Sequence, residues 1–115
     1  MKHAHYSNVE AKPVKAEGSR KATVRWLIGP TEAPNFSMRR FELKAGGNTP
    51  LHDHPWEHEI YFLEGEGSVR HETGSTPVKA GDVMLVQPGE EHGVFADAGT
   101  PLVFLCMIPN EGAGH

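Results

Sequence analysis

Turn-forming residues divide this sequence into short segments, and their spacing constrains the fold more than any other feature. Breaks that contain glycine fall at residues 29–30, 45–48, 65–67, 73–75, 80–81, 88–89 and 98–99. Turn signals that recur roughly every 8–12 residues are typical of an all-β sandwich or barrel. No segment has a sustained apolar period of about 3.6 residues, so we predict no long helix.

The segments between the breaks predict the strands and the domain boundaries. We predict strands at residues 22–28, 36–44, 51–54, 57–63, 68–72, 82–86, 92–96 and 102–108. A chain of 115 residues fits one domain. We expect residues 1–20 to form an N-terminal arm with at most one edge strand and residues 21–110 to form the barrel. Residues 111–115 are assigned to a C-terminal tail, and fraying is expected from residue 110 onward.

Composition excludes several function classes. The net charge is −4 and no basic run is present, which argues against a nucleic-acid-binding protein. No run approaches the roughly 20 apolar residues of a membrane span. The single cysteine, Cys106, cannot form an internal disulfide, so we expect a reducing, cytoplasmic location.

Histidine is unusually frequent, with 8 residues, and four of them are candidate metal ligands. His52 and His54 are two residues apart, so in a strand they project to the same side. His58 shares the parity of the apolar residues that follow it at positions 60 and 62, so we expect it to face the core. His92 follows the turn at residues 88–91.

Several imidazoles buried together need partners for their ring nitrogens, and one metal ion satisfies all of them. Neutral imidazole suits Zn, Cu, Fe and Ni and tolerates Mn. The alternative is that His52 and His54 form an ordinary polar surface pair.

Two segments resemble the conserved motifs of the cupin family. The first motif begins at Gly46 and runs through His52 and His54 to Gly65, and the second runs from residue 81 to His92. The second motif departs from the family pattern where Gln87 and Ala96 stand in place of the usual proline and asparagine. The resemblance implies an all-β, jelly-roll-like double-stranded β-helix barrel in a single domain.

The resemblance also implies a metal site in the barrel, with an unusual fourth ligand. Seven residues before Gly65, where the family usually has glutamate, this chain has His58. The ligands are then His52, His54, His58 and His92. In the alternative reading Glu59 is the fourth ligand, because a β-bulge can exchange the faces of two neighbouring residues.

Three further segments, residues 33–36, 54–59 and 104–109, are similar to small thermophilic manganese cupins with an all-histidine site. This similarity implies a homodimer that holds a divalent metal ion, with Mn favoured and Fe, Ni, Cu or Zn also compatible. An octahedral ion with four protein ligands keeps two positions open, as catalytic sites do.

The alternation of side chains along the predicted strands indicates which residues surround the candidate site. We expect an apolar pocket lined by side chains of the last strand and of the ligand strand: Phe104, Cys106, Ile108, Ile60 and Phe62. The plainer interpretation is that the two phenylalanines only fill the core and that Cys106 is a small buried apolar residue. Glu57 is a candidate to hold a ligand imidazole through its free N–H. Arg39 or Arg40 is a candidate to steer an anionic substrate, although an exposed strand charge is the favoured interpretation.

Two function classes remain open. The first is a metal-dependent oxygenase- or oxidase-type enzyme that acts on a small, partly apolar substrate. The second is a non-catalytic module that holds a metal ion or a small ligand for sensing or storage. Because cupins host many unrelated functions, the fold does not decide between them.

Overall fold

The computed structural model describes residues 1–112, which form an all-β structure with two short 3-10 helices. Seven of the strands carry the barrel and its immediate extensions, and a two-residue strand belongs to the N-terminal arm. The elements are η1 (Tyr6–Asn8), β1 (Lys12–Pro13), β2 (Arg20–Ile28), β3 (Phe36–Asn48), β4 (His58–His71), β5 (Gly74–Lys79), β6 (Val83–Val86), β7 (Gly93–Ala96), β8 (Leu102–Pro109) and η2 (Asn110–Gly112).

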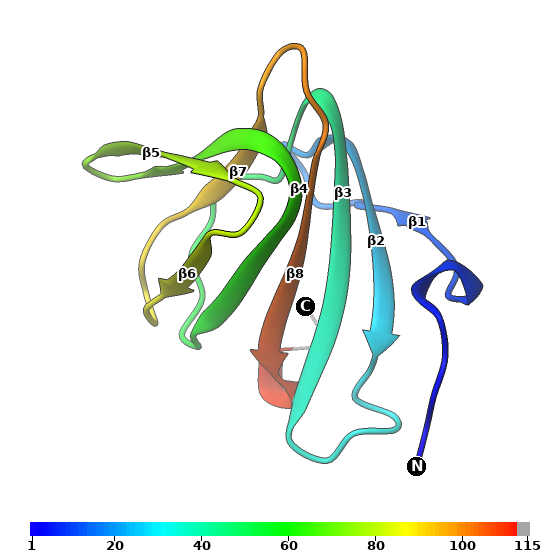
Figure 1. Ribbon diagram of the computed structural model, residues 1–115. Coiled ribbons are helices and arrows are strands. Elements are labelled where there is room, and N and C mark those ends of the chain that lie inside the picture. Colours follow the sequence, from blue (N-terminus) through cyan, green and yellow to red (C-terminus); the bar gives the residue numbers. More distant parts are fainter. Residues whose placement is uncertain (113–115) are drawn as a thin grey trace.

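The strands close into a barrel, one of the two folds that the turn spacing allowed and the one that the resemblance to cupins implied. Strand β8 pairs with both β3 and β4, and β7 also pairs with both β4 and β3, so the four strands form a ring. Strand β2 adds to β3, while β5 and β6 add to the two ends of β4. Figure 1 shows the long, curved β4 beside β8, with β3 and β2 following on the other side.

Strand β4 corrects the prediction of two separate strands with a break at residues 65–67. The chain passes through this glycine-rich segment as one strand, with a register shift between Phe62 and Glu64 and a positive φ of 89° at Gly65. Both glycines are needed for close approach. A Cβ on Gly65 would lie 1.8 Å from the carbonyl oxygen of Pro101, and one on Gly67 would lie 2.1 Å from that of Phe95. The glycines thus bend the strand around the barrel.

Other predictions differ from the structure. The break predicted at residues 45–48 is wrong, because β3 continues through it to Asn48. The strand predicted at residues 51–54 is reduced to one isolated bridge between His52 and His92, and β5 was not predicted at all. Fraying from residue 110 is wrong for residues 110–112, because Asn110 bonds to Ser37 Oγ and Gly112 packs against Trp56. Positions 113–115 of the expected tail lie outside the described residues.

The core lies between β3, β8 and β4, where inward side chains from paired positions meet. One such row joins Phe41, Phe104 and Phe62. The rings of Phe41 and Phe104 stack with centroids 5.2 Å apart, and Phe104 lies 5.6 Å from Phe62. Phe62 has no exposed surface. This aromatic row fills the barrel on one side of the histidines described below.

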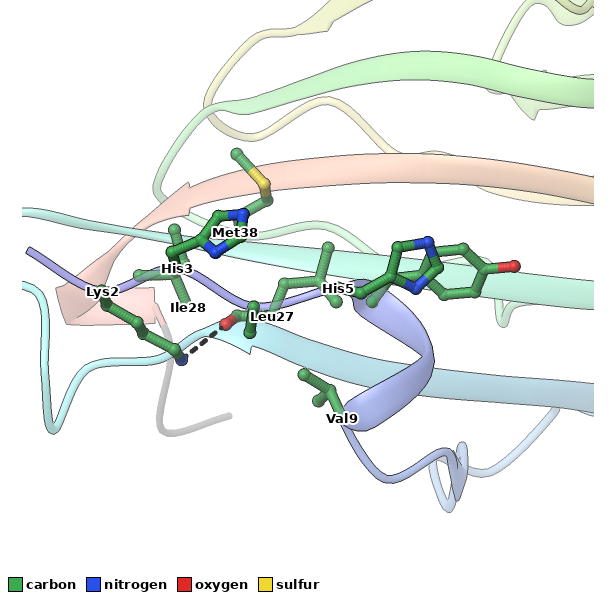
Figure 2. A pocket seen from close by; sticks show the side chains of 9 residues that line it. Lys2, His3, His5, Val9, Leu27, Ile28 and Met38 are labelled. Atoms are coloured by element: carbon green, nitrogen blue, oxygen red, sulfur yellow. Dashed lines mark hydrogen bonds between the residues drawn. The ribbon is translucent and has the colours of Figure 1, made fainter.

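The N-terminal arm lies along the outside of β2 and β3. Tyr6 of η1 lies under the guanidinium of Arg40, whose Cζ is 3.8 Å from the ring centroid, and β1 pairs with β2. Lys2 bonds to the carbonyl oxygen of Leu27 and to Glu32. Figure 2 shows the cavity of about 220 Å³ that the arm forms with β2 and Met38. The arm therefore covers the outer face of this sheet.

In the part of the chain that the structure describes, no helix has both the length and the apolar character needed to cross a lipid bilayer.

Candidate metal centre

Four histidine side chains gather at one end of the barrel. His52 and His54 come from the loop between β3 and β4, His58 begins β4, and His92 immediately precedes β7. The ring centroid of His52 lies 4.5 Å from that of His54 and 4.6 Å from that of His92. His58 lies 5.3 Å from His54 and 4.9 Å from His92, and the two longest separations are 6.4 Å. We call these four residues the histidine cluster.

Backbone hydrogen bonds hold the two loops of the histidine cluster together. His52 and His92 exchange both N–H···O bonds, at 3.0 and 2.9 Å. The N–H of Gly89 donates to the carbonyl oxygen of His54 at 2.7 Å. The ring of His54 also stacks on Trp56, with centroids 4.6 Å apart and planes 9° apart. Residues that are 40 positions apart in sequence are thereby fixed side by side.

The hydrogen bonds of two rings determine their tautomer. His52 Nδ1 lies 2.6 Å from the carbonyl oxygen of Pro50, and His92 Nδ1 lies 3.0 Å from that of Glu90. A carbonyl oxygen only accepts, so Nδ1 carries the proton in both neutral rings and Nε2 keeps its lone pair. Histidines that bind metal ions through Nε2 are oriented in this way.

His58 is the most deeply enclosed member, with 5% of its surface exposed. Its Nδ1 lies 3.3 Å from Cys106 Sγ, while its Nε2 is buried without a hydrogen-bond partner. An unsatisfied buried nitrogen is costly, and a metal ion is one partner that would satisfy it. The donor chemistry at His58 therefore fits a metal ion.

Burial lowers the pKa of three members of the cluster, His54, His58 and His92. Burial, followed by the charges that His92 and Arg39 would exert, lowers the pKa of His58 to about 3. Burial, followed by the neighbouring histidines and Arg39, lowers the pKa of His54 to about 4. Burial also lowers the pKa of His92, although its hydrogen bond to Glu90 acts in the opposite direction. Neutral imidazole is the form that binds metal ions.

The four imidazole rings lie close together, but they are not arranged as the ligands of a preformed metal site. Within residues 1–112, no group of three or more His, Cys, Asp and Glu side chains has the arrangement of a preformed metal site. The separations between the rings and the free Nε2 of His58 still mark this cluster as the place where a site would assemble. The assignment of these four residues as metal ligands stays a prediction.

The two acidic candidates lie elsewhere. Glu59 is exposed on the outer face of β4, in register with Leu85 and Met107, while its neighbour His58 is buried. Glu57 is exposed as well. The Nδ1 atoms of His52 and His92 bond to backbone carbonyl groups rather than to a carboxylate.

The expected pocket residues lie inside the barrel. Ile60, Phe62, Phe104, Cys106 and Ile108 are all buried. A second cavity, of about 290 Å³, borders the cluster at His92 and is otherwise lined mainly by β6 and by residues around β5.

Arg39 and Arg40 correct the interpretation of exposed strand charges. Arg39 faces the interior, where its Nη2 donates to Cys106 Sγ at 3.0 Å. Arg40 lies on the outer face, 9% exposed, where its guanidinium stacks on the Tyr6 ring and forms an ion pair with Glu42.

Sequence reasoning did not assign Trp26 and Trp56 to this region. Trp56 stacks on His54, and the Cζ of Arg39 lies 5.4 Å from the ring centroid of Trp26. The place of Trp56 two residues after His54 was a usable signal. The position of Trp26 depends on the pairing of β2 with β3, which no local pattern shows.

The sequence pattern of this barrel matches a known family over most of its length. The model of the Cupin domain family matches residues 39–108, which include most of each strand of the ring and the whole histidine cluster. This chain belongs to the cupin family. The family resemblance and the barrel expected from the motifs are thereby confirmed.

Relatives with known names bind or transform small organic molecules. The chain is 44% identical over 71 residues to the oxalate-binding protein of Thermotoga maritima, and this match spans 60% of the chain and 58% of that protein. The polyketide cyclase RemF from Streptomyces resistomycificus has 36% identity and a TM-score of 0.91, covering 96% of this chain and 80% of that one. A predicted oxalate decarboxylase from Thermotoga maritima has 27% identity and a TM-score of 0.81, covering 94% and 98%.

Proposed function

We propose that this cupin binds a divalent metal ion through His52, His54, His58 and His92 and uses it to hold a small organic ligand through oxygen atoms. One observation carries the proposal: the buried Nε2 of His58 has no partner within a cluster of neutral imidazoles. The hydrogen bonds from Nδ1 of His52 and His92 support it, because they leave Nε2 as the donor atom.

The bound metal would supply Lewis acidity and, if it is redox-active, an electron acceptor or donor. We favour Mn on the resemblance, with Fe, Ni, Cu and Zn as alternatives that imidazole also suits. The protein contributes positioning and exclusion of water. Phe62 and Phe104 are buried inside the barrel, and Phe62 lies on the same face of β4 as His58.

For the reaction class we propose oxygenase- or oxidase-type chemistry on a small, partly apolar substrate. The named relatives support a small oxygen-rich ligand, since one binds oxalate and another is a polyketide cyclase. Turnover of an aromatic alkene or a diketone with dioxygen or peroxide by the metal-loaded protein would support the enzyme.

A non-catalytic binding module is the second candidate. The observation that favours it is the 44% identity to a protein named for binding oxalate rather than for a reaction. Ligand binding without turnover of any substrate of these classes would favour the module, and ligand binding that persists after removal of the metal would argue against a metal-held ligand.

Metal content tests the centre directly. Tag-free wild-type protein is compared by ICP-MS with His58→Ala and with Glu59→Ala, a matched control from the neighbouring position that faces the exterior. We expect about one metal ion per chain in the wild type and in Glu59→Ala, and loss in His58→Ala. Loss in Glu59→Ala alone would instead make the carboxylate the ligand, and a metal-free wild type would refute the centre.

A homodimer and a cytoplasmic location are further proposals. Exposed apolar side chains on β4 and β6 give a surface that a second copy would cover: Tyr61 (42%), Val83 (74%) and Leu85 (50%). Light scattering on the wild type and on Leu85→Asp tests this. A dimer in the wild type and a monomer in the variant are expected, and a monomeric wild type would refute the dimer.

A further inference from the structure

Arg39 places a positive charge inside the barrel beside the histidine cluster. On β3 it pairs with Cys106 of β8, and its Nη2 donates to the Cys106 Sγ at 3.0 Å. Its Cζ lies 4.9 Å from the ring centroid of Phe41 and 5.4 Å from that of Trp26. Cys106 in turn contacts His58, so a single sulfur atom separates the guanidinium from a proposed metal ligand.

This guanidinium is poorly satisfied. Its Nε is buried without a hydrogen-bond partner, and a cysteine sulfur is a weak acceptor. Within residues 1–112, Glu42 and Glu64 form ion pairs with Arg40 on the outer face, and no carboxylate forms an ion pair with Arg39. The aromatic faces of Phe41 and Trp26 stabilise its charge in part but accept no in-plane hydrogen bond.

The charge balance of the interior favours an anion. Imidazole binds a metal ion as an uncharged ligand, so a divalent ion held by four histidines would keep its full charge, and Arg39 adds another positive charge nearby. Water is a poor screen inside a barrel, and the repulsion between the two cations is relieved only when a negative group lies between them. Planar oxyanions match the guanidinium because two parallel N–H groups can donate to two oxygens.

We propose that Arg39 selects carboxylate ligands for this centre, by donating hydrogen bonds from its free N–H groups to a carboxylate whose molecule also binds at the metal. This inference rests on the proposed function and narrows its ligand class to small carboxylic acids. Arg39 acts here as a specificity-determining residue, and the aromatic rings beneath it limit the ligand to a compact or flat molecule.

Isothermal titration calorimetry with oxalate as the probe tests the inference. Manganese-loaded wild type is compared with Arg39→Met, Arg39→Lys and Arg40→Met, and ICP-MS and thermal melting are recorded for each. Arg40→Met is the matched control, since it removes a buried arginine at the next position of the same strand, on the opposite face from Arg39. The neutral diketone acetylacetone is titrated as a second probe.

With equal metal content, we expect Arg39→Met to lose at least about 30-fold in oxalate affinity, as for removal of one partner of a buried charge pair. We expect Arg40→Met to stay within about threefold, and Arg39→Met to leave acetylacetone affinity within about threefold, because that probe arrives without a charge. If Arg39→Met does not fold, Arg39→Lys carries the test, with an expected loss of at least about fivefold from the lost paired geometry.

The other possible outcomes distinguish a failure of this inference from a failure of the proposed metal centre. Unchanged oxalate affinity in both Arg39 variants, at equal metal content, would overturn the inference and leave the centre intact. A wild type that binds metal but not oxalate would do the same. A wild type that binds no metal but still binds oxalate through Arg39 would refute the metal centre and support the anion site.

Discussion

Acidification should destabilise the metal-free protein, because folding lowers the pKa of three histidines of the cluster, His54, His58 and His92. The pKa of His58 is lowered from 6.5 to about 3 and that of His54 to about 4. When the pH falls below 6.5, these histidines take up protons in the unfolded chain but not in the folded one. The unfolded state then binds more protons, so the free energy of unfolding is fully present above pH 6.5 and decreases from there toward pH 3–4.

The size of the effect follows from the distance between pH and the ordinary pKa. At pH 5 the unfolded His58 is 1.5 pH units below its ordinary pKa of 6.5, and about 1.4 kcal/mol per unit gives a loss of about 2 kcal/mol. His54 is more exposed, so we discount its share to about 1 kcal/mol. The buried His92 contributes in the same direction. A loss of about 3 kcal/mol is a large part of the stability of a small domain.

Urea denaturation followed by tryptophan fluorescence, in EDTA at pH 7.5, 6 and 5, measures this loss. We expect the midpoint to fall by roughly 1–3 M urea between pH 7.5 and 5. His58→Gln should remove about 2 kcal/mol of the pH dependence. Equal stability at pH 7.5 and 5, or the same slope in His58→Gln as in the wild type, would refute the reasoning.

Three further predictions concern the barrel. Gly67→Ala should lower the free energy of unfolding by about 2–3 kcal/mol or more, since the new Cβ would lie 2.1 Å from the Phe95 carbonyl oxygen. Gly99→Ala is the control: its new Cβ would have nothing within 4 Å, so its free energy of unfolding should stay within about 0.5 kcal/mol of the wild type in the same urea assay. Phe104→Ala should cost about 3–5 kcal/mol, because its ring is 2% exposed within the aromatic row, and a smaller loss in calorimetry would mean that the barrel collapses into the space. Cys106 should react with a thiol reagent only in denaturant, because the thiol is 3% exposed and burial raises its pKa, so rapid labelling of the native protein would contradict its enclosed position.

The fold was predictable where one local rule decided the outcome. Turn residues and alternation were enough to predict an all-β sandwich or barrel, because each strand of such a fold buries one face and ends at a turn. The resemblance to the cupin motifs selected the barrel. The same rule failed at Gly65 and Gly67, which serve contacts with Pro101 and Phe95 from distant segments rather than ending a strand. Strand β5 carries little apolar signal because five of its six residues are exposed, so only its pairing with β4 defines it.

The histidine cluster was predictable in its members but not in its details. Alternation with Ile60 and Phe62 is enough to expect His58 to point inward and Glu59 outward, and the structure places both side chains in this way. The hydrogen bond between His58 and Cys106 was out of reach, because the two residues are 48 positions apart and meet only when β4 pairs with β8. The backbone partners of His52 and His92 likewise depend on loop conformations that spacing does not determine.

The alternation of side chains along β3 could have predicted which of Arg39 and Arg40 faces the interior. On a strand with one buried face, two adjacent arginines cannot both be outside, and Arg39 shares the parity of Phe41 and Leu43, which are buried. The sequence therefore contained the inward position of Arg39. Nothing in the sequence indicated that a guanidinium would be buried there, because burying a charge is unfavourable unless it is paired. The structure provides aromatic faces and a cysteine sulfur for Arg39 but, within residues 1–112, no carboxylate, whereas Arg40 has its own acidic partners. An anionic ligand at the centre would supply this missing partner, which is the reason for the proposal made for Arg39.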